Sequence, residues 1–414
     1  MLGNVTPLVT ILFVRGSAIL VRFFFLLCCL KFFDLSDFGR YMALVGGATL
    51  GGYLLGLESG TLLSRKLIKG PSPHTLGRLK SFLQLYQMLS LVVIIAALVL
   101  GYFKVELTFL IFGLAVVSEA MFFELRKVLV ALGKIYSAAL VEFVKNSILV
   151  GILFILNSVD GFTVGNMFIG FATTSFLLST YLTGSIWISL NMKEISGSFS
   201  FPFEWRNFPI LVHGGISILI EISGRFYFIA VDDPETAGIY SIFSGLVFVI
   251  PLLVYSGTMS VYFREAGERF LSGSVEYLNF CRKFMAHSII IYIGCVVFLL
   301  AIFNPVVQLL GKAGLLEYHD EFLFLLIVPI VYIVDSRYFY PLHFNGSDWQ
   351  IAISSLGGFT FFSSIVGISM FLGSLNLQGF ILILLLSTGI SAFLKWLYCR
   401  KYLGIYCGHS KKTV

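Results

Sequence analysis

Four basic residues lie within long apolar stretches of the sequence: Arg15, Arg22, Lys145 and Arg225. Arg15 and Arg22 are seven residues apart, nearly two helical turns, so both lie on one helix face. Neither has an acidic residue in its own stretch, 8–30. Charges in such stretches usually face a cavity or an opposite charge. Three interpretations stay open for the arginines: a cavity for an anionic substrate, ion pairs with distant carboxylates, or side chains extended to the helix end.

Three acidic residues in the apolar stretches could neutralise these cations or bind an ion. Glu221 precedes Arg225 by four residues and Glu142 precedes Lys145 by three, spacings at which helical side chains meet. Each couple is therefore either a self-neutralised pair or part of a functional site. Glu119 has no basic residue three or four positions away. A buried carboxylate can exchange a proton or hold sodium, so Glu142, Glu221 and Glu119 are the candidates for ion coupling.

Motifs for catalysis or metal binding are absent from the sequence. The six histidines form no helical pair with metal-ligand spacing, and the six cysteines form no Cys-x-x-Cys. The sequence contains neither a phosphate-binding P-loop nor a nucleophilic serine elbow. We therefore expect no metal site, no cofactor and no enzymatic activity.

The composition requires lipid as the solvent for these stretches. Hydrophobic residues make up 58% of the chain and charged residues 12%, whereas soluble domains carry about 25% charged residues. The formal net charge of +6 then reflects membrane topology and not nucleic-acid binding. We expect a multi-pass membrane protein, with its first apolar stretch retained as a helix.

About twelve apolar stretches are long enough to cross a bilayer as helices, which needs roughly 20 residues each. The expected helices lie near 8–30, 39–63, 82–103, 106–126, 135–157, 162–190, 208–230, 236–262, 283–303, 320–343, 349–373 and 377–398. Pro251 and Pro329 should kink two of them. Gly52, Gly56 and Gly60 have the spacing of a closely packed helix interface.

Basic residues set the orientation. Only Lys31, Arg40, Lys104 and Lys312 fall between helices on one side. The other basic loop residues fall on the opposite side, together with Lys395, which we assign to the C-terminal tail. By the positive-inside rule the opposite side is cytoplasmic, and both termini lie there. An even number of helices agrees with this orientation.

A short internal repeat suggests two halves. Gly39, Tyr41 and Gly46 align without a gap with Gly238, Tyr240 and Gly245, at the start of the second and the eighth helix. Two six-helix halves in the same orientation form a parallel repeat with a pseudo-two-fold axis along the membrane normal. We expect an N-terminal bundle over 1–190, a cytoplasmic linker over 191–207 and a C-terminal bundle over 208–414.

These features resemble the Wzx-type O-antigen and polysaccharide flippases of the multidrug/oligosaccharidyl-lipid/polysaccharide exporter superfamily. The resemblance rests on short segments: Leu35-Ser-Asp-Phe-Gly-Arg-Tyr41, Asp233-Pro-Glu-Thr-Ala-Gly-Ile-Tyr240, Ser223-Gly-Arg-Phe-Tyr-Phe228 and Glu124-Leu-Arg-Lys127. Gly224 replaces an acid that is usual in the family, and Arg225 keeps the basic position.

The resemblance implies a mechanism and a substrate. Undecaprenyl-diphosphate-linked oligosaccharide units would pass from the cytoplasmic to the outer leaflet as the two halves rock around a central cavity. Arg15, Arg22, Arg225 and Lys145 would bind the diphosphate, since a guanidinium binds phosphate oxygens in a bidentate manner. Proton or sodium coupling would use Glu142, Glu221 or Glu119. Membrane lipid and other polysaccharide-assembly membrane proteins are the expected partners.

Two other classes of function stay open. A drug or cation exporter of the same superfamily would share the fold, but three arginines suit a cationic substrate poorly. A polytopic enzyme of O-antigen processing, a polymerase or an acyltransferase, would need large outer loops or a catalytic histidine. The longest expected outer loop, 304–319, is short and carries few groups able to catalyse a reaction.

Overall fold

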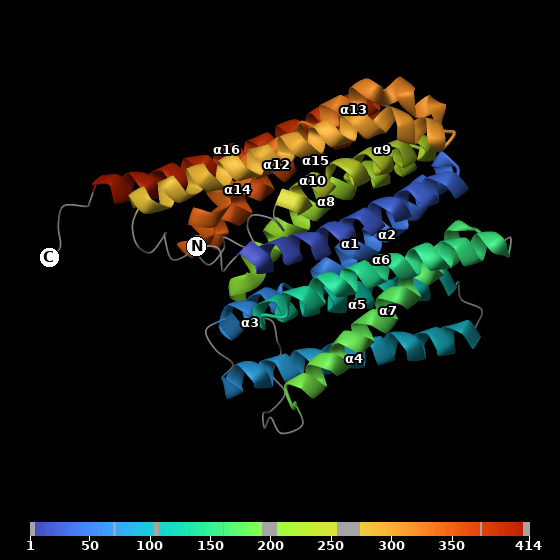
Figure 1. The fold of residues 1–414 in the computed structure, drawn as a ribbon, viewed down its shortest axis with the longest axis horizontal. Helices are drawn as coiled ribbons and strands as arrows, with labels where there is room; N and C mark the ends of the chain where they lie inside the picture. The colour runs from blue at the N-terminus through green and yellow to red at the C-terminus, as the bar shows by residue number, and fades with distance from the viewer. Residues whose placement is uncertain are drawn as a thin grey trace. The chain divides into compact units, whose positions relative to one another are not determined.

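The computed structural model describes residues 5–68, 72–102, 107–159, 161–192, 205–254, 274–372 and 375–408. Within these ranges all regular secondary structure is helical (Figure 1). The expected all-α fold is therefore confirmed for the described part of the chain. By its internal contacts the chain divides into two compact units, Val9–Leu211 and, with the first eight residues, Val212–Val414. Each unit is described by itself.

The helices follow the apolar stretches of the sequence. Helices up to residue 189 are α1 (Val5–Phe32), α2 (Leu35–Gly56), α3 (Ser59–Ile68), α4 (Pro73–Tyr102), α5 (Leu107–Ala131), α6 (Ile135–Ser158) and α7 (Val164–Ser189). A short 3-10 helix, η1 (Trp205–Asn207), leads into α8 (Phe208–Ala230). The later helices are α9 (Pro234–Val247), α10 (Val249–Val254), α12 (Ser274–Leu309), η3 (Ala313–Tyr318), α13 (His319–Leu325), α14 (Val328–Phe344), α15 (Asp348–Leu372) and α16 (Leu377–Gly408).

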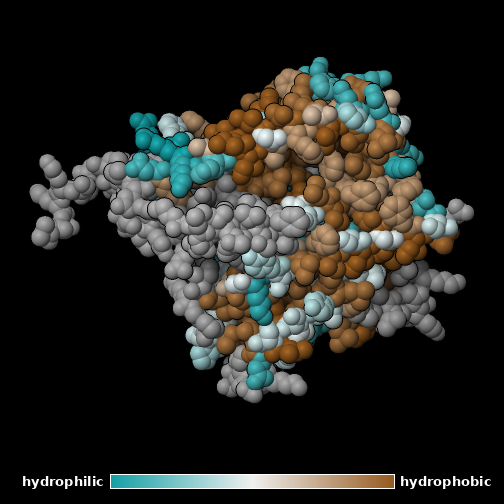
Figure 2. Space-filling view, in the orientation of Figure 1, coloured by the Kyte–Doolittle hydropathy of each residue, from teal (hydrophilic) through white to brown (hydrophobic). Residues whose placement is uncertain are grey.

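Each expected range overlaps one helix or two consecutive helices of the structure. Seven helical stretches among the described residues, from Tyr136–Ser158 to Leu377–Lys401, are long and apolar enough to cross a membrane. Hydrophobic residues cover much of the helix sides in the view of Figure 2. The chain is therefore a multi-pass membrane protein, and twelve crossings stay a prediction.

Two prolines divide expected helices, as predicted. A proline inside a helix clashes with the carbonyl four residues earlier. The residue four positions before Pro251 is Val247, where α9 ends, and the residue four positions before Pro329 is Leu325, where α13 ends. The interruptions between α9 and α10 and between α13 and α14 thus have a direct backbone cause.

Helix α5 lies at the centre of the unit Val9–Leu211, where it packs against α2, α3, α4 and α7. The glycines of α2 and α3 allow this close approach. A Cβ atom on Gly52 would lie 2.8 Å from the Cβ of Glu119, and one on Gly60 would lie 2.7 Å from the carbonyl oxygen of Glu124. Such distances exclude a side chain, so close packing of the glycine face, the expected role, is confirmed.

The two aligned segments begin their helices in the same way. Asp34 caps α2 by accepting a hydrogen bond from the Asp37 amide, and Asp233 caps α9 by accepting one from the Thr236 amide. Tyr41 and Tyr240, which follow at equivalent positions, are both buried. The repeated sequence therefore produces a repeated helix start.

Candidate functional site

Helix α5 is the element of the unit Val9–Leu211 along which four ion pairs gather. Its second half carries Glu119, Glu124, Arg126 and Lys127. Each of these side chains forms an ion pair, three of them with a partner on another element. Because α5 packs against helices on several sides, Glu119 and Glu124 are shielded from water and need protein partners instead.

Glu119 is neutralised by Lys145 of α6. The ammonium of Lys145 donates to Oε1 of Glu119, and the Ser175 hydroxyl of α7 donates to the same oxygen at 2.5 Å. The Glu119 side chain is 3% exposed and that of Lys145 10%. The pair therefore joins α5, α6 and α7 inside the unit.

Aromatic rings surround the Lys145 ammonium. Its Nζ lies 4.6 Å from the ring centre of Phe122 and 4.8 Å from that of Phe171. A ring face attracts a cation through its negative quadrupole. Lys145 is thus held by one carboxylate and two rings.

Glu142 interacts with Arg126 of α5, not with Lys145 of its own helix. The Arg126 guanidinium lies 2.7 Å from the Glu142 carboxylate, and both side chains are partly exposed. The alternative of a local Glu142–Lys145 pair is therefore wrong. The spacing of Glu142 and Lys145 along α6 made a local pair plausible. Because α6 packs on α5, Glu142 pairs with Arg126 instead and Lys145 pairs with Glu119.

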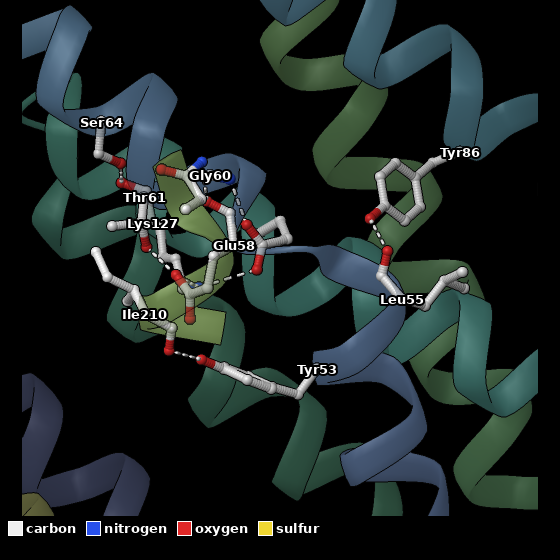
Figure 3. A network of polar contacts seen from close by, with 11 residues as sticks. Tyr53, Leu55, Glu58, Gly60, Thr61, Ser64, Tyr86, Lys127 and Ile210 are labelled. Carbon is white, nitrogen blue, oxygen red and sulfur yellow. Dashed lines mark hydrogen bonds and ion pairs between the residues drawn. The ribbon is translucent and has the colours of Figure 1, made fainter. Parts of the chain in front are cut away.

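A second cluster lies where α2 gives way to α3 (Figure 3). Leu57 and Glu58 both have φ of 53°, a left-handed conformation that L-residues adopt at a cost. The expectation of one continuous helix over 39–63 is wrong at this turn. The turn directs Glu58 toward α5, where Nζ of Lys127 lies 2.8 Å from its carboxylate.

Lys127 is shared by two carboxylates. Its Nζ also lies 2.9 Å from Glu124, a side chain with no exposed surface. The other oxygen of Glu124 accepts a hydrogen bond from the Gly60 amide, and Thr61 donates to Glu58. We call Glu58, Lys127 and Glu124 the triad. It fixes the start of α3 against α5 (Figure 3).

The arginines proposed from the sequence lie in different surroundings. Arg22 of α1 is exposed and forms no ion pair among the described residues. Arg225 of α8 is 6% exposed, and its guanidinium lies 3.5 Å from the Ser244 hydroxyl of α9. Glu221, one turn before it, is half-buried, and its carbonyl accepts the Tyr240 hydroxyl. The side chain of Arg15 lies outside the described part.

The second unit contains a buried pair that sequence reasoning missed. Nζ of Lys395 on α16 lies 2.9 and 2.7 Å from the two carboxylate oxygens of Asp335 on α14. Lys395 is 1% exposed, although the sequence interpretation counted it among the cytoplasmic charges of the C-terminal tail. Its position inside the apolar range 377–398 was the signal that could have identified it.

These clusters suit electrostatic neutralisation better than metal chemistry. Among the described residues, no group of three or more His, Cys, Asp or Glu side chains could hold a metal ion. Glu58, Glu119, Glu124, Glu142 and Asp335 each lie within ion-pair distance of a lysine or arginine. A positively charged ligand therefore finds no unpaired carboxylate among these five.

The fold is similar to that of solved MATE transporters. No protein-family model matches the sequence, and no curated protein matches it significantly. An outward-facing multidrug resistance MATE family transporter of the MOP superfamily aligns with a TM-score of 0.61 and 13% identity, over 97% of this chain and 96% of that chain. An inward-facing one gives 0.63 and 11% over the same shares, and a MATE structure in complex with MaD3S gives 0.64 and 12%, again over 97% and 96%.

The alignment includes nearly the whole of both chains, so the chain has a MATE-like fold throughout. At this level of identity the likeness concerns the fold alone. It agrees with the fold that the sequence resemblance implied and does not distinguish a flippase from a drug exporter.

Proposed function

We propose that the protein is a flippase that carries a lipid-linked oligosaccharide diphosphate from the cytoplasmic to the outer leaflet of a bacterial inner membrane. Alternating access is the proposed mechanism, because similar folds occur in both inward-facing and outward-facing transporters. In this mechanism the substrate site opens to each side of the membrane in turn.

The pairing of the charged side chains is the observation that favours an anionic substrate. Five carboxylates of the described helices and turns are already paired with lysine or arginine. In contrast, Arg22 is an exposed cation with no ion pair among the described residues. An anionic substrate suits such a chain, since arginine binds phosphate oxygens through several N–H groups.

A drug or cation exporter is the second candidate, because multidrug resistance transporters share the fold. Such a protein would need a carboxylate available for its cationic substrate. The paired carboxylates argue against this candidate and also against Glu119 and Glu142 as substrate ligands.

Deletion of the gene tests the proposal directly. Lipid-linked repeat units should accumulate at the cytoplasmic face, and surface glycan should disappear, because the units no longer reach the outer leaflet. Labelling of the units from each side of inverted and right-side-out vesicles measures their location. Units that reach the outer face but stay unpolymerised would instead identify an enzyme that acts after translocation.

A further inference from the structure

Each compact unit contains an acid that pairs one-to-one with a buried lysine of another helix. In the unit Val9–Leu211, Lys145 pairs with Glu119. In the unit that contains Val212–Val414, Lys395 pairs with Asp335 at 2.7 Å. Among all contacts of the described residues, these two lysines and two acids form no other ion pair. Each pair is therefore balanced, with one positive and one negative charge.

Each lysine lies on a different helix from its acid and far from it in the sequence. Glu119 and Lys145 are separated by 26 residues, and Asp335 and Lys395 by 60. In both pairs the lysine lies on a later helix than the acid, α6 after α5 and α16 after α14. The same solution thus occurs in both units with different residues.

A carboxylate in an apolar interior is stable only when something neutralises it. A proton, a bound sodium ion or a side-chain ammonium can do so. At Glu119 the ammonium already contacts the carboxylate, and Phe122 and Phe171 flank it. At Asp335 both oxygens contact the ammonium, and the Phe339 ring lies 6.0 Å from it. Aromatic rings offer no oxygen ligands to sodium.

We propose that Lys145 and Lys395 are built-in counter-ions, so that Glu119 and Asp335 bind neither a coupling proton nor sodium. The part of this inference that concerns ion coupling rests on the proposed transport function. It moves Lys145 from the substrate site to a positioning role, and it removes Glu119 from the candidates for ion coupling.

Few other titratable groups lie near the pairs. Tyr41 of α2 interacts electrostatically with Glu119, and His213 of α8 interacts with Lys395 and with His343 of α14. His343 itself lies 3.3 Å from Asp348 of α15. Because these neighbours can also titrate, each variant that lacks one member of a pair must be compared with the variant that lacks both members.

The test removes each built-in cation from the purified full-length protein in detergent. Lys145→Met and Lys395→Met keep the length and apolar character of the side chain and delete its charge. Melting temperature is measured against sodium concentration, with potassium replacing sodium at constant ionic strength, and then against pH without sodium. Glu119→Gln/Lys145→Met and Asp335→Asn/Lys395→Met are the matched controls.

The wild type should show no sodium-specific change in melting temperature. Each methionine variant should gain a dependence, because its bare carboxylate must now bind sodium or a proton. If sodium binds, the melting temperature rises with the logarithm of sodium concentration. If a proton binds, it falls as pH rises. The double variants should lose both dependences and should be more stable than the corresponding single variants, since neither leaves an unpaired buried charge.

Two results would overturn the proposal. One is a wild-type melting temperature that rises with sodium, or that falls as pH rises below the titration range of lysine, when Glu119→Gln or Asp335→Asn abolishes this dependence. The carboxylate then binds the ion despite its lysine. The other is a folded methionine variant without any new dependence. If a methionine variant fails to fold, the double variant of the same pair is compared with its acid variant, Glu119→Gln or Asp335→Asn. A double variant that is no more stable than this acid variant also contradicts the proposal. The assay uses no transport substrate, so its outcome is independent of flipping.

Discussion

Lys127, whose side chain is partly exposed, differs from Lys145 and Lys395 because it interacts with two carboxylates. Glu58 and Glu124 lie 2.8 and 2.9 Å from its Nζ, and neither has another ion pair among the described contacts. Formally the triad carries one excess negative charge. Hydrogen bonds from Gly60 and Thr61 offset part of the free-energy cost of holding this excess charge inside the protein. Lys127 is therefore the cation on which both acids depend, beside these hydrogen bonds.

Replacement of Lys127 by methionine should strongly destabilise the protein, because it leaves two carboxylates close together without a cation. Loss of one partner of a buried ion pair costs about 3 kcal/mol or more. Unfolding in a detergent series of increasing denaturing strength measures the change. Lys283→Met is the control, since Lys283 is exposed and a surface substitution typically changes stability by less than about 0.5 kcal/mol. Equal stability of the two variants would contradict the role of Lys127.

At the scale of elements, α5 organises its unit because glycine allows neighbouring helices to approach it. Gly52 faces the Cβ of Glu119 and the amide of Ala120, at distances too short for any added atom. The glycine face therefore places the backbone of α2 directly against the part of α5 that carries the buried acid.

Gly52→Ala should separate α2 from α5 and lower stability. The added methyl group would lie 2.8 Å from the Cβ of Glu119 and 2.9 Å from the Ala120 amide nitrogen. Overpacking of this kind costs about 1–3 kcal/mol. Gly151→Ala in α6 is the matched control, because nothing lies within 4 Å of the added carbon. Thermal denaturation should distinguish the two variants, and a Gly52→Ala protein as stable as the control would exclude tight packing at this point.

The elements were more predictable from the sequence than the contacts between them. Helix positions follow from the length of apolar stretches, and Pro251 and Pro329 interrupt the helices as expected. Partners of charged residues depend on packing between helices, which local spacing does not contain. Glu142 therefore pairs with Arg126 and not with Lys145, and Lys395 lies buried beside Asp335 and not in a cytoplasmic tail. The turn at Leu57 and Glu58 was missed because the glycines on either side of it, Gly56 and Gly60, were interpreted as part of a helix-packing face.

At the scale of the whole molecule, the proposed transport depends on cations that can receive an anionic substrate. Arg22 meets this requirement among the described residues, since it is exposed on α1 and has no ion pair. Lys145, in contrast, is already bound to Glu119. Arg22 and Arg225 therefore remain the cations proposed for substrate binding in the described side chains.

Arg22→Ala should abolish or greatly reduce flipping while membrane expression stays normal, because the exposed side chain supports no packing. Arg22→Lys should restore part of the activity if charge alone matters and none if bidentate contacts matter. Vesicle-based translocation of lipid-linked units measures both variants. Lys31→Ala, at the exposed end of the same helix, is the control. Full activity of Arg22→Ala would remove this residue from the site.

The membrane potential acts on net charge, at about 2.3 kcal/mol per elementary charge moved through 100 mV. The Glu119–Lys145 and Asp335–Lys395 pairs carry none, so a unit that rocks across the membrane field does no electrical work through them. In the proposed cycle, the membrane potential does work on the diphosphate of the substrate and on any charged group that moves without its partner. Translocation of a dianionic lipid should therefore respond to voltage according to the charge of the cargo.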